Sequence, residues 1–238
     1  GTFKDSLRAP IHRWFRYPAG YSYKFVLENF DLFGVEPGMW VYDPFSGSGT
    51  TLICAKQRGI NAYGVEAHAF VHWVADVKLY WDFDQHLLVK ELERLLAEAK
   101  TAVEQVKEDD ALAGIFPALV YKCYHPLDLG VLYKLREFIL NEVENPHVRD
   151  FLKLALTDTL RGASVAGTGW PYISPRKNNG QKVPKNAFRV FQNTVWQMSD
   201  DLRTVIGKTP PSEVRNVLGL SLIHISEPTR LLSISYAV

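Results

Sequence analysis

The sequence has few of the features that mark secreted, metal-binding or membrane proteins. Its 238 residues include only two cysteines, Cys54 and Cys123, which are too few for a disulfide framework or a zinc site. No apolar run reaches the roughly 18 residues of a membrane helix, and the first residues show no signal-peptide pattern. The net charge of +1 gives no overall basic excess, although a local basic face would still permit nucleic-acid contact. We therefore expect a cytoplasmic protein without a membrane segment or a metal.

The first third of the chain has the pattern of a strand, a helix and a second strand. Residues 39–42 are a short apolar run that follows a turn at 36–38. Residues 52–58 have helical character and end at Gly59, and residues 61–66 read as the second strand. Strand, helix and strand in this order predict a parallel sheet and therefore an α/β fold.

A glycine-containing loop joins the first strand to the helix. Gly47 and Gly49 permit positive φ and a close approach of the backbone to a ligand, and the helix that follows offers unpaired N–H groups. A phosphate-binding loop needs a lysine after its last glycine, where Thr50 stands. A dinucleotide fingerprint needs a third glycine where Leu52 stands. Both common interpretations of such a loop therefore fit poorly.

The loop resembles the S-adenosylmethionine motif of N6-adenine and N4-cytosine DNA methyltransferases. The resemblance implies a Rossmann-like fold, S-adenosyl-L-methionine as cofactor, and an exocyclic amine in double-stranded DNA as methyl acceptor. It also implies restriction-modification, with a restriction endonuclease as a partner, and leaves adenine and cytosine open as targets. The acidic first residue would face the amino-acid end of the cofactor and the aromatic residue would lie against it. The loop residues implied to bind the cofactor are Asp43, Pro44, Phe45, Gly47, Ser48, Gly49, Thr50 and Thr51.

Two further segments are candidates for the same cofactor. Glu66 ends the second predicted strand, where a carboxylate can accept hydrogen bonds from both ribose hydroxyls. Ala67 follows it and is expected to line the adenine pocket. Residues 12–19, with Tyr17 and Pro18, resemble a His-x-x-x-x-Tyr-Pro-Ala segment that packs on the methionine side of the cofactor in one branch of the family.

The catalytic motif of this family is missing from the sequence. In these enzymes an [Asp/Asn/Ser]-Pro-Pro-aromatic string orients the target amine and stacks on the flipped base. The nearest string, at 170–172, has one proline and leaves Tyr172 as the catalytic candidate. We therefore expect the motif beyond residue 219 of the intact gene and no activity from this chain. Two alternatives are an RNA guanine-N2 methyltransferase and a non-catalytic subunit that binds the cofactor or DNA.

From about residue 68 to residue 107 the pattern is helical, and residues 108–126 are expected to be a connector. Apolar residues at helical spacing predict helices over 86–107, 127–143, 147–160 and 188–206. The glycine- and proline-rich stretch 162–186 predicts a loop. Basic residues with interleaved aromatics around this loop favour nucleic-acid contact, although a solvated charged loop has the same composition. The candidate contacts are Arg176, Lys177, Lys182 and Lys185, with Arg189 beside them.

The end of the chain resembles translated sequencing-adapter sequence. Residues 220–230 (Leu-Ser-Leu-Ile-His-Ile-Ser-Glu-Pro-Thr-Arg) are similar to the in-frame translation of a transposon-based sequencing adapter, although a natural strand and turn would also fit. We therefore expect a truncated fragment with three segments. They are the cofactor-binding part of a methyltransferase domain at 1–83, a helical insertion with a target-recognition role at 84–219, and a non-native tail at 220–238.

Overall fold

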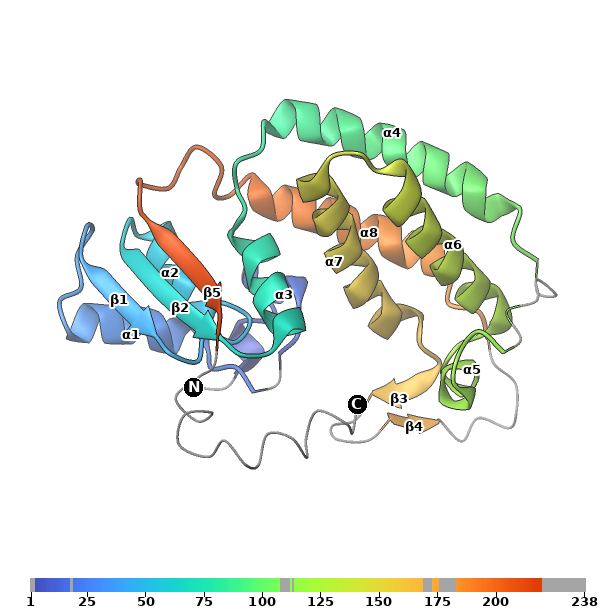
Figure 1. The fold of residues 1–238 in the computed structure, drawn as a ribbon, viewed down its shortest axis with the longest axis horizontal. Helices are drawn as coiled ribbons and strands as arrows, with labels where there is room; N and C mark the ends of the chain where they lie inside the picture. Colours follow the sequence, from blue (N-terminus) through green and yellow to red (C-terminus); the bar gives the residue numbers. More distant parts are fainter. Residues whose placement is uncertain are drawn as a thin grey trace. The chain divides into compact units, whose positions relative to one another are not determined.

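The computed structural model describes residues 3–17, 19–107, 112, 114–168, 173–175 and 183–219 (Figure 1). The chain divides into two compact units, and each is described by itself. The first unit contains the residues up to Asp82 together with those from Thr204 onward, and the second runs from Phe83 to Arg203.

The first unit is built on three parallel strands. They are β1 (Trp40–Asp43), β2 (Asn61–Glu66) and β5 (Val214–Leu218), in the order β1-β2-β5. Asp43 pairs with Gly64, and Glu66 pairs with Leu218, so the carboxyl ends of the strands meet at one edge. The predicted α/β class with a parallel sheet is therefore confirmed.

Helices α1 (Tyr23–Leu32), α2 (Thr50–Gln57) and α3 (Ala69–Leu79) accompany this sheet, with short 3-10 turns η1 (Phe3–Asp5) and η2 (His12–Trp14) before them. Helix α2 packs closely on β2, because a Cβ added to Gly64 would lie 2.7 Å from Leu52 Cδ1. Leu52, Ile53 and Cys54 have no exposed surface, so this part of α2 belongs to the core of the first unit. The sheet and α2 therefore form two tightly packed layers.

The second unit is mainly helical. Its helices are α4 (Gln85–Glu104), α5 (Ala118–Cys123), α6 (Pro126–Glu142), α7 (Pro146–Ala163) and α8 (Ala187–Leu202). Their starts follow local capping rules: the Asp84 and Asn145 side chains accept hydrogen bonds from first-turn N–H groups, and Pro146 occupies the first turn of α7. The four predicted helices are confirmed, with ends that differ by a few residues.

The structure departs from the sequence expectations in three places. A two-stranded antiparallel ribbon, β3 (Ala166–Thr168) with β4 (Ile173–Pro175), lies within the predicted loop. Helix α5 lies in a stretch where no element was expected. Residues 204–219 lie with the sheet rather than with the helices, because β5 pairs in parallel with β2 (Figure 1). Pro210 packs against Gly59, because a Cβ added to Gly59 would lie 2.7 Å from the Pro210 Cβ. This contact helps to hold the segment 204–219 in the first unit. Residues 220–238 lie outside the described residues.

Candidate cofactor site

The glycine loop leaves β1 at its carboxyl end and enters α2. Gly47 and Gly49 have φ of 52° and 84°, the left-handed region that glycine adopts without strain. The Gly49 N–H donates to the Ser46 carbonyl at 2.8 Å, and the Ser46 N–H donates to the Val65 carbonyl at 3.0 Å. The loop is thus fastened to β2 at the sheet edge where parallel α/β folds bind their ligands.

Asp43 is almost fully buried and its carboxylate is held by three donors. Oδ1 accepts the Phe45 N–H at 3.0 Å. Oδ2 accepts the Thr51 hydroxyl at 2.5 Å and the Tyr21 hydroxyl at 2.7 Å. Burial, followed by the negative charge of Asp43, raises the pKa of Tyr21 above its ordinary value, so this phenol stays a donor. The carboxylate of Asp43 therefore has one fixed orientation.

Glu66 connects the end of β2 to the loop. Its Oε2 accepts the Gly47 N–H at 2.9 Å and its Oε1 accepts the His68 N–H at 2.8 Å. Tyr17 lies beside them, because a Cβ added to Gly47 would lie 3.0 Å from Tyr17 Cε1. The pKa of Tyr17 is raised by burial first and then by the charge of Glu66. Two carboxylates thus stand at neighbouring strand ends with the glycine loop between them.

An aromatic cluster adjoins Glu66 on α3. The Phe70 ring is 40% exposed and lies 5.7 Å from Trp73 and 5.6 Å, edge to face, from Phe15. The His68 ring lies 6.5 Å from Phe70, and Ala67, which precedes His68, is half-buried. These rings offer an apolar surface of the kind that stacks on a base. Sequence reasoning missed Phe70 and Trp73, although two aromatics at helical spacing directly after a candidate ribose ligand were the available signal.

The predicted site residues fall into two groups. Asp43 to Thr51, Glu66, Ala67 and Tyr17 come together in the first unit, and their role in cofactor binding stays a prediction. Pro18, Tyr172, Arg176, Lys177 and Lys182 lie outside the described residues, as does most of the predicted basic loop. Lys185 and Arg189 are exposed residues of the second unit.

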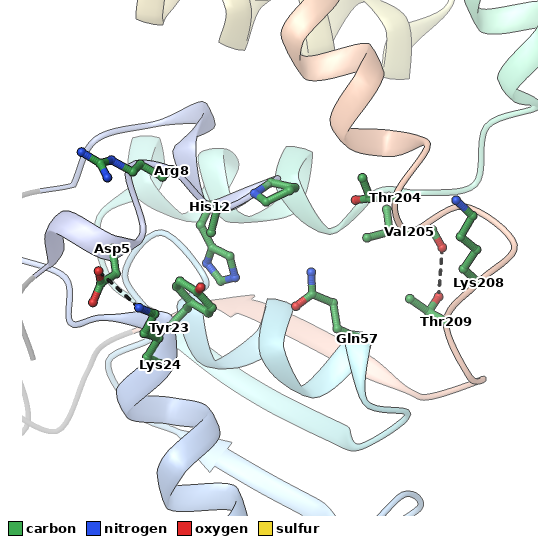
Figure 2. A pocket seen from close by; sticks show the side chains of 12 residues that line it. Asp5, Arg8, His12, Tyr23, Lys24, Gln57, Thr204, Val205, Lys208 and Thr209 are labelled. Atoms are coloured by element: carbon green, nitrogen blue, oxygen red, sulfur yellow. Dashed lines mark hydrogen bonds and ion pairs between the residues drawn. The ribbon is translucent and has the colours of Figure 1, made fainter.

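A separate hollow of about 560 Å³ also opens in the first unit (Figure 2). His12, Tyr23, Gln57 and Thr209 line it, and the Asp5–Lys24 ion pair of 3.5 Å stands at its wall. It shares no residue with the glycine loop or with Glu66, so it is distinct from the candidate site.

Two absences concern only the part of the chain that the structure describes. There, no cluster of three or more His, Cys, Asp or Glu side chains is arranged to hold a metal ion. Within the same ranges, none of the helices combines the length and apolar character that crossing a membrane requires.

The first unit is an α/β fold whose parallel sheet carries, at its carboxyl edge, a glycine loop and an acidic residue at the end of the next strand, which is the edge where parallel α/β folds bind ligands. Comparison with known proteins shows what the chain is similar to. Residues 29–75, which contain the loop and Glu66, match the DNA methylase family of N6- and N4-amino methyltransferases. The chain is also 32% identical, over 228 residues and 95% of its length, to the type II methyltransferase M.BsoBI of Geobacillus stearothermophilus. The chain is thus similar to N6- and N4-amino DNA methyltransferases.

A second relative matches a shorter stretch. The type II methyltransferase M.MjaII of Methanocaldococcus jannaschii is 36% identical over 70 residues, which are 29% of this chain and 13% of the relative. The chain spans 42% of the length of M.BsoBI. No solved structure matches the chain significantly.

Proposed function

We propose that the site at the carboxyl edge of the sheet binds S-adenosylmethionine, within a Rossmann-like methyltransferase fold. The protein would use it to methylate an exocyclic amine of adenine or cytosine in double-stranded DNA. The observation that carries this proposal is the pair of oriented carboxylates, Asp43 and Glu66, joined by hydrogen bonds to one rigid glycine loop. The similarity to the DNA methylase family and to M.BsoBI supports the same assignment.

The donor and acceptor set of the site fits this cofactor. Asp43, which Thr51 and Tyr21 hold in place, would accept from the cationic amino group of the methionine part. Glu66 would accept hydrogen bonds from the ribose hydroxyls, while the Gly47 and His68 N–H groups hold its carboxylate in one orientation. Phe70 and Ala67 would contact the adenine. Tyr17 and Phe45 would close the methionine side, as would Pro18, which lies outside the described residues.

When bound, the cofactor supplies a methyl group on a positively charged sulfur, which departs as a neutral thioether when an amine attacks. The residues of this chain would bind and orient it, and orientation is a large share of the catalysis available to such a transfer. The complete [Asp/Asn/Ser]-Pro-Pro-aromatic motif that orients the amine is not in this sequence, so we assign cofactor binding to this chain and methyl transfer to the protein as a whole.

Calorimetric titration of the chain with S-adenosylmethionine tests the assignment. Glu66→Gln should weaken binding by about tenfold or more, because a charged acceptor is replaced by a weaker one. Glu213→Gln is the matched control, since Glu213 is an exposed acid beside the amino end of β5, at the opposite edge of the sheet. Equal affinities for Glu66→Gln and the wild type would contradict the site, and no binding by the wild type would contradict the proposal itself.

The helical unit is proposed to contact DNA and to serve target recognition. Lys185 and Arg189 are exposed near the start of α8, and in the sequence they follow the basic residues 176, 177 and 182. The double variant K185A/R189A should weaken DNA binding and lower the slope of log affinity against log salt by about one per lost phosphate contact. An unchanged slope would show that Lys185 and Arg189 contact solvent and not DNA phosphates. A restriction endonuclease partner is proposed from the family alone, because both relatives are named type II methyltransferases.

A further inference from the structure

A fully buried lysine lies beneath the glycine loop. Lys78, in the last turn of α3, is 1% exposed, and its Nζ donates a hydrogen bond to the Ser48 carbonyl at 3.1 Å. Ala75, one helical turn earlier, lies against Gly49, because a Cβ added to Gly49 would be 3.1 Å from the Ala75 Cβ. One face of α3 thus supports two consecutive residues of the loop.

The peptide unit between Ser48 and Gly49 is therefore fixed at both ends. Its N–H donates to the Ser46 carbonyl at 2.8 Å, and its carbonyl accepts from Lys78. Since Lys78 is buried, this carbonyl is turned toward the protein interior. Rotation of the peptide would break both hydrogen bonds and would change the direction of the loop backbone beside Gly47, whose N–H reaches Glu66.

The groups that face Lys78 leave its charge uncompensated. Cys54 of α2 and His12 of η2 interact with it electrostatically, and Arg58 acts in turn on Cys54. Burial raises the pKa of Cys54 to about 12, and burial followed by the charge of Lys78 lowers the pKa of His12 to about 3. Both are therefore neutral near neutral pH. Among the described residues the amine has a carbonyl as its partner and forms no ion pair.

Burial also lowers the pKa of Lys78 from 10.5 to about 7. The amine and the ammonium forms both donate hydrogen bonds, so the contact to Ser48 persists on either side of neutral pH. The lowered pKa shows that burying the charged form of Lys78 opposes folding. Fully buried lysines are unusual, and an apolar residue would serve a purely structural role as well.

We propose that Lys78 is a positioning residue for the cofactor: it holds the Ser48–Gly49 peptide in the orientation that the bound cofactor requires. This inference rests on the proposed function of the loop. It assigns the hydrogen bond to Ser48, rather than the bulk of the side chain, as the feature that matters for binding.

Two substitutions separate the hydrogen bond from the packing. Lys78→Met keeps most of the side-chain volume and removes the donor, whereas Lys78→Gln keeps a neutral donor. Thr159→Val is the control, because it removes a different buried hydrogen bond, from Thr159 Oγ1 to the Ala155 carbonyl at 2.8 Å, in the second unit. Each variant is titrated calorimetrically with S-adenosylmethionine, and its thermal midpoint is recorded in the same buffer.

Lys78→Met should bind about tenfold more weakly than the wild type, and Lys78→Gln within about threefold of it, as expected for loss and retention of one buried hydrogen bond. Thr159→Val should bind like the wild type. If Lys78→Met binds as well as the wild type, or if Lys78→Gln with a native midpoint loses as much as Lys78→Met, the inference is wrong. If Lys78→Met does not fold, the affinity of Lys78→Gln decides alone, with a loss beyond about tenfold contradicting the inference. Failure of the wild type to bind would instead overturn the proposed function.

Discussion

The buried amine of Lys78 makes a quantitative prediction about stability and pH. Its pKa is about 7 in the folded chain, against 10.5 for an ordinary lysine. Below pH 7 both the folded and the unfolded chains carry the proton, so the cost of burying the charge is fully present. Between these two pKa values the unfolded chain binds more protons than the folded one. The free energy of unfolding must therefore rise with pH through this window.

The size of the rise follows from the two pKa values. Between about pH 6.5 and about pH 9 the contribution of Lys78 is about 2.5 kcal/mol, because each unit of pKa shift corresponds to about 1.4 kcal/mol. In this pH window the titration of the neighbouring groups His12 and Cys54 contributes little to the change in stability. His12, with a pKa of about 3, affects stability only below its ordinary value, and Cys54, with a pKa of about 12, affects it only above about pH 9.

Urea unfolding at several pH values in this window measures the effect. The probe is the fluorescence of the first-unit tryptophans, among which Trp14 and Trp81 are buried. In Lys78→Met the rise with pH should be smaller by this amount, and the variant should be stabilised relative to the wild type at the acidic end of the window. Lys4→Met, at an exposed position of η1, should keep the wild-type dependence. Parallel curves for the wild type and Lys78→Met would refute the reasoning.

Three further predictions concern other buried contacts. Tyr21→Phe removes one donor to Asp43 and should weaken cofactor binding about three- to tenfold by calorimetry, with unchanged affinity showing that Thr51 and Phe45 suffice. Gly64→Ala should lower the free energy of unfolding of the first unit by roughly 1–3 kcal/mol in urea, since the new Cβ would lie 2.7 Å from Leu52 Cδ1; no loss would mean that α2 can shift on the sheet. Buried Asp128 accepts hydrogen bonds from the Lys185 and Ala187 N–H groups at 2.6 and 2.8 Å. Asp128→Ala should therefore lower the free energy of unfolding of the second unit by about 3 kcal/mol in urea. Asp128→Asn, which keeps one acceptor, should lower it less, and equal losses for the two variants would contradict this account.

The sequence predicted the elements whose signals are local. The loop between β1 and α2 was recognisable because glycine at 47 and 49 is required by positive φ, and the helices of the second unit have strong apolar periodicity. Glu66 was placed at a strand end by the strand pattern before it. Those elements depend on neighbours in the chain, and short-range rules describe them well.

The parts that depend on distant neighbours were missed. Strand β5 is only five residues long and mostly exposed, so nothing in 214–218 distinguishes it from a loop without knowledge of β2. The contact of Lys78 with Ser48 is equally invisible, because a lysine near the end of an amphipathic helix normally faces solvent. The Tyr21 hydroxyl reaches Asp43 across 22 residues, and the sequence around it carries no periodic signal.

The parallel pairing of β5 with β2 also has a consequence for the order of folding. Ala62 pairs with Val214, so the sheet gains its third strand only after the whole helical unit has left the ribosome. Closing a flexible loop of about 150 residues carries a length-dependent entropy cost of about 4 kcal/mol. A helical unit that is already compact shortens the effective tether between the two strands. Substitutions that slow folding of the helices of the second unit should therefore delay completion of the sheet in the first unit.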